Sequence, residues 1–147
     1  MSIEDLDLKH ESYMELSQRN TELQEKQEQL LLQRFEESKT IIEWYKEKRL
    51  IFTHPSINYR SSRGPILGFD DEESELIIYR PDKGLLKINM RTKEEKNAFF
   101  EHLVRDGHFE TAMEGFGYLK IMIDKYASDY KEDNQTRESL LSKYVDA

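Results

Sequence analysis

The longest regular pattern of apolar and polar positions lies in the first third of the chain. Leu16, Leu23 and Leu30 recur every seven residues, and the same spacing reaches Trp44. Such spacing places one apolar side chain on a single helix face every two turns. Residues 1–54 contain neither Pro nor Gly, the residues that most often end a helix. The pattern predicts one long helix over residues 1–49.

The second core position of this heptad is half polar. It falls on Tyr13, Asn20, Gln27, Arg34 and Ile41. A buried Asn fixes the register of two parallel helices at a cost in stability, whereas Gln27 and Arg34 weaken the contact. Two interpretations stay open. Either the helix forms a coiled coil with a second copy, or it is a solvated helix that packs its C-terminal third on the head or folds back as part of a bundle. The residues expected to carry the coiled coil are Leu16, Asn20, Leu23, Leu30 and Trp44.

The apolar stripe of this helix widens near its end. Apolar residues become denser within residues 30–35 and again within residues 41–45. A wider stripe indicates packing against a larger surface. We therefore expect the rest of the chain to dock on this part of the helix.

Short apolar runs separated by turn residues predict strands after the helix. Residues 50–53 form the first run, which a His-Pro pair ends. Residues 66–69, 75–80 and 85–91 form three further runs. The last two are joined by a link that has Pro first and Gly last, as a four-residue hairpin loop prefers. The sequence predicts an antiparallel β-meander whose last strand has one buried and one solvated face.

A capping-box pattern predicts a helix directly after the meander. In the run Thr92-Lys93-Glu94-Glu95, the Thr hydroxyl is expected to accept from the backbone of the last Glu, whose side chain reaches back. An Asp-Gly pair at 106–107 ends this helix. Its inward stripe is expected to consist of Ala98, Phe99, Phe100, Leu103 and Val104.

A further helix is expected over residues 109–130, because apolar residues continue there at helical spacing on two sides. Gly115 and Gly117 interrupt it, although a Gly costs about 1 kcal/mol in a helix interior relative to Ala. We attribute them to a close helix crossing or a kink. Residues 131–135 predict a polar break, and residues 136–145 predict a last short helix.

The predicted elements define an α+β fold with two parts. Residues 1–49 form a long helix for oligomerisation or docking. Residues 50–147 form a small head, in which two or three C-terminal helices pack on the β-meander. A head of this length is large enough for its own core.

Composition and charge exclude several classes of function. The chain has 147 residues and no cysteine, so disulfides and thiolate chemistry are excluded. Its net charge is −8, and the middle of the chain, residues 50–91, is neutral with six acids and six bases. An acidic chain is a poor nucleic-acid binder, because that affinity comes mainly from neutralised phosphates. A protein partner is favoured instead.

The first residues lack the basic start and the apolar core of a signal peptide. No run approaches the roughly 18 apolar residues of a membrane span. We therefore expect a soluble, cytoplasmic protein that does not enter a membrane.

The best ligand candidate in the sequence is the loop 54–65. It contains no acid, and Tyr59, Arg60 and Arg63 lie among small and turn-forming residues. Arginine forks can grip a phosphate or a carboxylate, and the tyrosine offers a stacking face. The alternative interpretation is an ordinary surface connection whose arginines balance the acidic run that follows it.

The search for catalytic and metal-binding groups gives weak candidates. None of the four histidines has a second histidine at the i, i+4 spacing that presents two rings to zinc. The five acids within residues 70–75 lack the ligand spacing and the turn Gly of a calcium loop. Asp82, Glu94 and Lys96 are similar to the acid, acid and lysine set of metal-dependent nucleases. However, they fall in a predicted hairpin loop and at a predicted helix start.

These observations favour a non-enzymatic protein–protein interaction module, an adaptor or an inhibitor. We expect it to form a homodimer and to need neither a cofactor nor a metal. A small-ligand or nucleic-acid module that uses the loop 54–65 is the first alternative. A metal-dependent hydrolase is the second.

Overall fold

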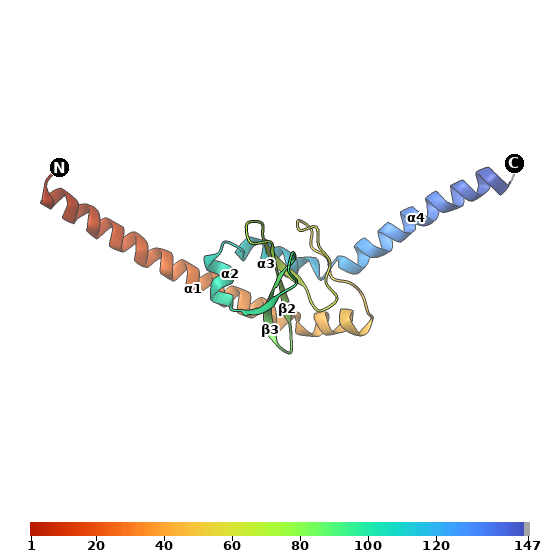
Figure 1. The fold of residues 1–147 in the computed structure, drawn as a ribbon, viewed down its shortest axis with the longest axis horizontal. Coiled ribbons are helices and arrows are strands. Elements are labelled where there is room, and N and C mark those ends of the chain that lie inside the picture. The colour runs from red at the N-terminus through yellow and green to blue at the C-terminus, as the bar shows by residue number, and fades with distance from the viewer. Residues whose placement is uncertain (146–147) are drawn as a thin grey trace.

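The computed structural model describes residues 1–145 and shows an α+β fold with two projecting helices. In Figure 1 the sheet, two short helices and the end of α1 form a central head, which the start of α1 and the end of α4 leave on opposite sides. This arrangement confirms the predicted fold class. The elements in chain order are α1 (Ile3–Glu47), β1 (Ile66–Asp70), β2 (Glu75–Arg80), β3 (Gly84–Asn89), β4 (Glu95–Ala98), α2 (Phe100–Arg105), α3 (Phe109–Tyr118) and α4 (Met122–Val145).

Helix α1 is unbroken over 45 residues, as predicted from the lack of Pro and Gly. It starts with a capping box, in which Ser2 Oγ accepts from Asp5 N–H and the Asp5 carboxylate accepts from Ser2 N–H. It ends in a Schellman motif, in which the N–H of Leu50 donates to the carbonyl of Tyr45 at 3.0 Å. Arg49 holds the left-handed position of this motif, with a φ of 57°, where Gly is the usual residue.

The last third of α1 is the central helix of the core. Its buried side chains alternate in spacing between four and three residues, which places them on one face. The Phe35 ring lies edge-on to the rings of Tyr79, Phe100 and Phe116, at centroid distances of 4.0, 4.0 and 4.7 Å. The sheet, α2 and α3 therefore all meet α1 at this ring, and the expected docking of the head is confirmed. The buried residues of α1 are Leu31, Phe35, Ser38, Ile42 and Tyr45.

The Tyr45 side chain connects α1 to the junction between α3 and α4. Its hydroxyl donates a hydrogen bond to the carbonyl of Leu119 at 2.7 Å and accepts one from the N–H of Ile123 at 3.1 Å. The ring is almost fully buried, with 2% of its surface exposed. A buried hydroxyl with both partners satisfied fixes the relative position of the elements that it joins.

The four strands form one antiparallel sheet in the order β1-β2-β3-β4. One face, which carries Ile77 and Tyr79, belongs to the main core with α1 and α3. The other face carries a second apolar cluster, which Ile57 and Tyr59 of the loop 54–65 cover. Both faces of the sheet are therefore covered, whereas the sequence predicted one solvated face on the last strand. The buried members of the second cluster are Ile66, Leu76, Ile78 and Leu86.

The predicted helix start at residues 92–95 is wrong. Residues Glu95–Ala98 instead form β4, which pairs with β3 at the edge of the sheet. Thr92 lies in the hairpin turn, where its hydroxyl accepts from Glu94 N–H at 3.3 Å and Lys93 has a φ of 66°. Pairing with an open sheet edge satisfies the backbone of these residues, so the tertiary context overrides the local helix signal.

Two smaller expectations also fail. Residues 50–53 do not form a strand, since only Phe52 pairs there, in an isolated bridge with Ser61. The inward stripe of α2 is shorter than predicted: Leu103 and Val104 are buried, but Phe99 precedes the helix and is 62% exposed.

The helix predicted over residues 109–130 is divided into α3 and α4, with a turn between them. Gly115 lies where α3 crosses β1, because a Cβ at this position would be 2.4 Å from the carbonyl oxygen of Ile66. The close approach is therefore between a helix and a strand, and not between two helices. A Cβ at Gly117 would meet nothing within 4 Å.

Helix α4 continues through residues 131–135, so the predicted polar break is wrong. Polar residues do not end a helix when no Gly or Pro is among them and their side chains pair along its surface. Here Arg137 donates to Asp133 at 2.9 Å, and Lys125 pairs with Asp129 at 2.8 Å. The result is a second projecting helix of 24 residues.

Candidate functional site

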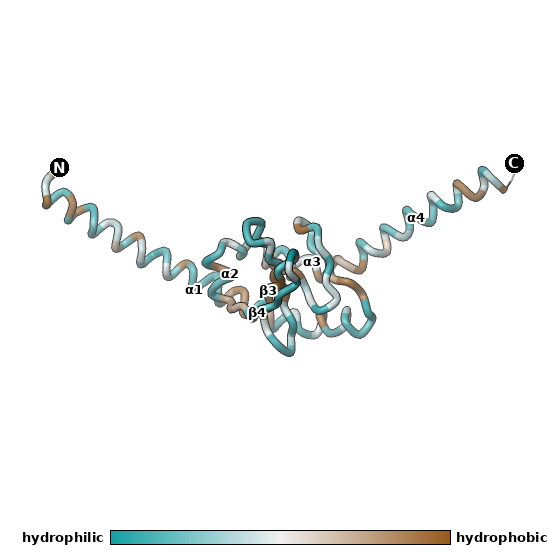
Figure 2. Tube along the Cα trace, viewed as in Figure 1, coloured by the Kyte–Doolittle hydropathy of each residue, from teal (hydrophilic) through white to brown (hydrophobic). Residues whose placement is uncertain are grey.

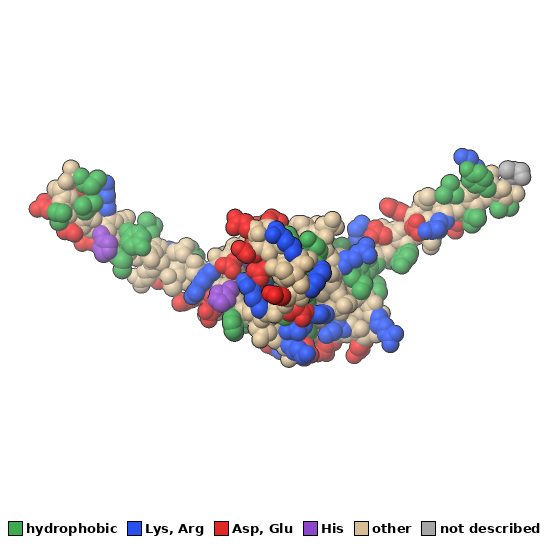
Figure 3. Space-filling view, in the orientation of Figure 1, with side chains coloured by type: hydrophobic (Ala, Val, Ile, Leu, Met, Phe, Trp, Pro, Cys, Tyr) green, Lys and Arg blue, Asp and Glu red, His purple; other side chains and the backbone are tan. Residues whose placement is uncertain are grey.

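Exposed apolar side chains recur in a regular pattern on the first part of α1. None of residues 3–30, which we call the arm, is buried. The exposed fractions are 62% for Tyr13, 68% for Leu16 and 43% for Leu23. Figure 2 shows apolar positions recurring along the arm, and Figure 3 shows their side chains on its surface. A helix end that buries nothing gains little from tertiary packing.

The predicted coiled-coil residues are not the ones that dock on the head. Leu31 and Tyr45 enter the core, while their neighbours Leu30 and Trp44 are half-buried and 42% exposed, respectively. One residue corresponds to about 100° of rotation around a helix of 3.6 residues per turn. At both positions the leucine face is therefore turned away from the docked face and is left for another surface.

The remaining predicted positions, Leu16, Asn20 and Leu23, lie in the arm. The Asn20 carbonyl oxygen accepts a hydrogen bond from Gln24 Nε2 at 2.9 Å. This contact leaves the two N–H groups of the Asn20 amide pointing into solvent for a further acceptor. Leu6, which is 45% exposed, extends the same pattern by one heptad. Its spacing of seven residues from Tyr13 could have identified it from the sequence.

The structure does not bring Tyr59, Arg60 and Arg63 together. Tyr59 packs on Phe69 at a centroid distance of 4.9 Å and covers the outer face of the sheet. The Arg63 guanidinium pairs with the Glu95 carboxylate of β4. Arg60 lines a cleft. Two of the three side chains thus have structural partners, which favours the interpretation of this loop as a covering connection.

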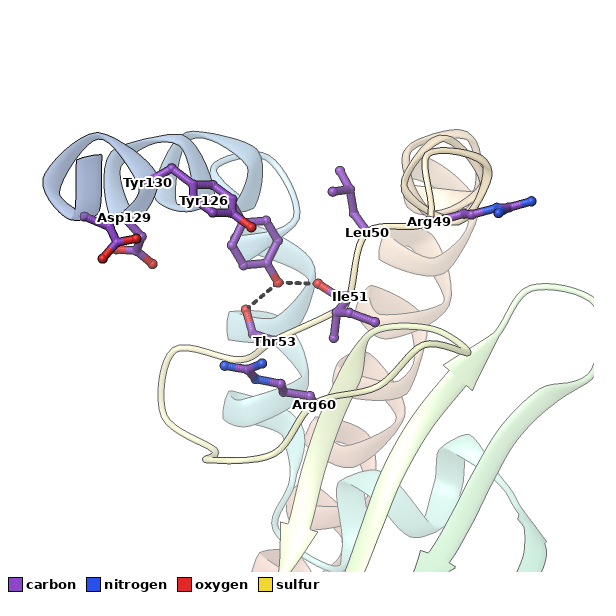
Figure 4. A pocket seen from close by; sticks show the side chains of 9 residues that line it. Arg49, Leu50, Ile51, Thr53, Arg60, Tyr126, Asp129 and Tyr130 are labelled. Atoms are coloured by element: carbon purple, nitrogen blue, oxygen red, sulfur yellow. Dashed lines mark hydrogen bonds between the residues drawn. The ribbon is translucent and has the colours of Figure 1, made fainter. Parts of the chain in front are cut away.

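A cleft of about 530 Å³ lies between this loop region and the start of α4. Figure 4 shows the Tyr126 hydroxyl between the carbonyl of Ile51 and the hydroxyl of Thr53, with which it forms hydrogen bonds, the latter at 3.2 Å. Because these groups bond to one another, they tie the loop to α4 instead of presenting free donors. The cleft is lined by Arg49, Leu50, Ile51, Thr53, Arg60, Tyr126, Asp129, Tyr130 and Asp133.

The charged groups of the cleft are mostly paired or directed outward. Asp129 and Asp133 each pair with a base on α4, and Figure 4 shows the Arg49 side chain directed away from Tyr126. The cleft therefore offers an apolar floor with one arginine, Arg60, at its side.

His54 is a buried side chain whose role the sequence did not reveal. Its Nε2 lies 2.7 Å from the carbonyl of Thr111, to which it donates, and its Nδ1 accepts from the N–H of Ser56 at 3.0 Å. The Ser56 hydroxyl in turn donates to the Glu114 carboxylate at 3.0 Å. With both ring nitrogens engaged by the backbone, His54 clamps the loop to α3 and has no nitrogen left for proton transfer.

Among residues 1–145, burial shifts the pKa of three side chains, and all three belong to the packed head. Desolvation raises the pKa of the Tyr45 and Tyr79 phenols above their usual value. Burial against Gly68 lowers the pKa of His108. These shifts follow from packing, so they do not mark a catalytic group.

The nuclease-like set predicted from Asp82, Glu94 and Lys96 is dispersed. Asp82 lies in the hairpin between β2 and β3, and Glu94 lies in the next hairpin, at the other end of β3. Six residues of a strand span about 20 Å, too far for two ligands of one cation. Lys96 pairs with Glu75 at 3.1 Å. Within residues 1–145, no group of three or more potential metal-ligating side chains is placed to hold a metal ion.

Comparisons with protein-family models, with curated proteins and with solved structures found no match for this chain. Across the part of the chain that the structure describes, no helix combines the length and the apolarity that crossing a membrane requires.

Proposed function

We propose that this chain is a non-enzymatic protein–protein interaction module, an adaptor or an inhibitor, that self-associates through its arm. In this proposal the head anchors one end of α1, and the arm presents a row of apolar side chains to a second chain. The apolar members of the row are Leu6, Tyr13, Leu16, Leu23 and Leu30, and the polar Lys9, Asn20 and Gln27 occupy its remaining positions.

The observation that supports this proposal most is the unpaired apolar row on a projecting helix. Isolated helices are marginal in water, and most of their stability in proteins comes from packing of an apolar face. The arm extends about 40 Å at 1.5 Å per residue, yet none of its residues is buried. A second helix on this row would supply the missing packing.

The experiment compares the mass of the full chain in solution with that of two double variants, by analytical ultracentrifugation. We expect the full chain to be a dimer. The variant Leu16→Glu/Leu23→Glu should be a monomer, because it places four carboxylates in the contact between the two arms.

The matched control is Leu8→Glu/Leu32→Glu, which makes the same substitutions on the opposite face of α1, where both leucines are exposed. It should remain a dimer. The proposal fails if the unmodified chain sediments as a monomer. It also fails if both double variants lower the mass equally, since the effect would then not depend on the leucine face.

A further inference from the structure

The charges of the arm are arranged around its apolar row. Residues 3–30 contain eight acids, and seven of them lie on the face opposite the row. Only Asp5 stands at a position that flanks the row, and the two bases on the flanks are Arg19 and Lys26. The arm is acidic as a whole, but the face that would meet a second copy has almost no acidic group. Repulsion between two acidic chains is thus kept away from the contact.

Lys9 is the one charged residue on the row itself. It lies near the free end of the arm, where its aliphatic stem can cover an apolar neighbour while the ammonium stays in water. It therefore interrupts the row without leaving a buried charge.

An antiparallel pair of arms would create two conflicts. If the two arms overlap along their whole length, Leu6 faces Leu30 of the second copy. Asn20 then faces Leu16 of the second copy. The N–H groups of the Asn20 side-chain amide would then be buried against an apolar side chain without an acceptor. The flanking positions would also place Arg19 opposite Arg19, which are like charges.

A parallel pair in register removes both conflicts. Each core residue then faces its own counterpart, so Asn20 meets Asn20 of the second copy. The free N–H groups of each amide can donate to the carbonyl oxygen of the other. Arg19 faces Gln24 of the second copy, and Asp5 faces His10. On the flanks no like charges meet. On the row the two Lys9 residues face each other near the free ends of the arms, where their aliphatic stems let the ammonium groups turn apart into water.

We propose that two copies of the arm pair in parallel and in register, with Asn20 facing Asn20. This inference rests on the proposed self-association and adds the orientation and register of the partner. Near residues 30–31 the docked face and the apolar row are about 100° apart. Because a parallel pair has a two-fold axis along its length, the two heads lie at the same end of the pair, on opposite flanks.

The chain has no cysteine, so single cysteines report on orientation in the full-length protein. We expect Leu6→Cys to form a disulfide-linked dimer in a glutathione redox buffer, because parallel pairing places the two thiols side by side. The control Leu8→Cys, on the opposite face, should cross-link at least about tenfold less at the same redox ratio. A mixture of Leu6→Cys with Leu30→Cys should give each homodimer and little of the mixed product.

A second variant tests the role of Asn20. In Leu6→Cys/Asn20→Leu the parallel preference should fall, so that a mixture with Leu30→Cys/Asn20→Leu yields more mixed disulfide. The orientation is disproved if Leu6→Cys links to Leu30→Cys and not to itself, although the reduced chains are dimers. Monomeric reduced chains would instead refute self-association, and with it any pairing.

Discussion

The two parts of helix α1 have the same secondary structure but opposite surroundings. Residues 31–47, which we call the docked segment, bury five side chains in the head. The arm buries none. Both parts carry apolar residues at heptad spacing, and both lack Pro and Gly. Periodicity therefore specifies a helix with an apolar face, but it does not specify what covers that face.

The difference between the two parts lies in side-chain size and density. The docked segment carries a buried aromatic ring, Phe35, which meets rings from the sheet and from both short helices. The arm carries isolated leucines alternating with Tyr13, Asn20 and Gln27. A large ring can fill a three-sided core, whereas a narrow row of leucines fits one neighbouring helix.

The largest effect is expected from Phe35→Ala. Removing this ring should lower the free energy of unfolding by about 3–5 kcal/mol, because a buried cavity replaces three ring contacts. Urea unfolding can be followed by the fluorescence of Trp44, the only tryptophan. The matched change in the arm is Tyr13→Ala. At a protein concentration low enough for monomers it should cost less than about 0.5 kcal/mol. Equal costs would show that the arm is packed as well.

A smaller effect is expected from Gly115→Ala. The added methyl would meet the carbonyl of Ile66, so α3 must shift from β1 at a cost of about 1–3 kcal/mol. The control is Gly117→Ala, two residues on, which should stabilise the protein by up to about 1 kcal/mol because its new methyl meets no atom. Thermal unfolding of both variants tests the difference. The assignment of Gly115 to a close contact fails if both variants are stabilised.

The smallest effect is expected from Ser2→Ala, which removes half of the capping box. The first turn of the arm should fray, with a local cost of about 1 kcal/mol. Hydrogen exchange of the amide of Asp5 should accelerate, since this N–H loses its acceptor. Exchange of amides in the docked segment should not change. If it did, the arm and the head would unfold as one unit, contrary to the comparison above.

The sequence predicted those parts of the fold that rest on a repeated local pattern. The uninterrupted helix and the two hairpins of β1, β2 and β3 follow from periodicity and from turn residues. Strand β4 could not be predicted, because residues 95–98 carry no alternation of apolar and polar positions. They become a strand only because β3 offers an unpaired edge.

For the candidate sites too, the sequence predicted some features and missed others. The seven-residue spacing of the leucines predicted the row. In the structure the row is exposed, on a different face of α1 from the residues that pack on the head. The sequence could not show that Tyr59 and Arg63 have structural partners, because those partners lie far from them along the chain. Phe69 lies on β1 and Glu95 on β4. Basic residues in a loop indicate a ligand only when the fold leaves them unpaired.

The Tyr45 side chain determines how α4 is oriented relative to α1. Its single oxygen is held by the backbone at both Leu119 and Ile123, on either side of the turn from which α4 departs. This oxygen therefore fixes the direction in which α4 leaves the head relative to the C-terminal end of α1.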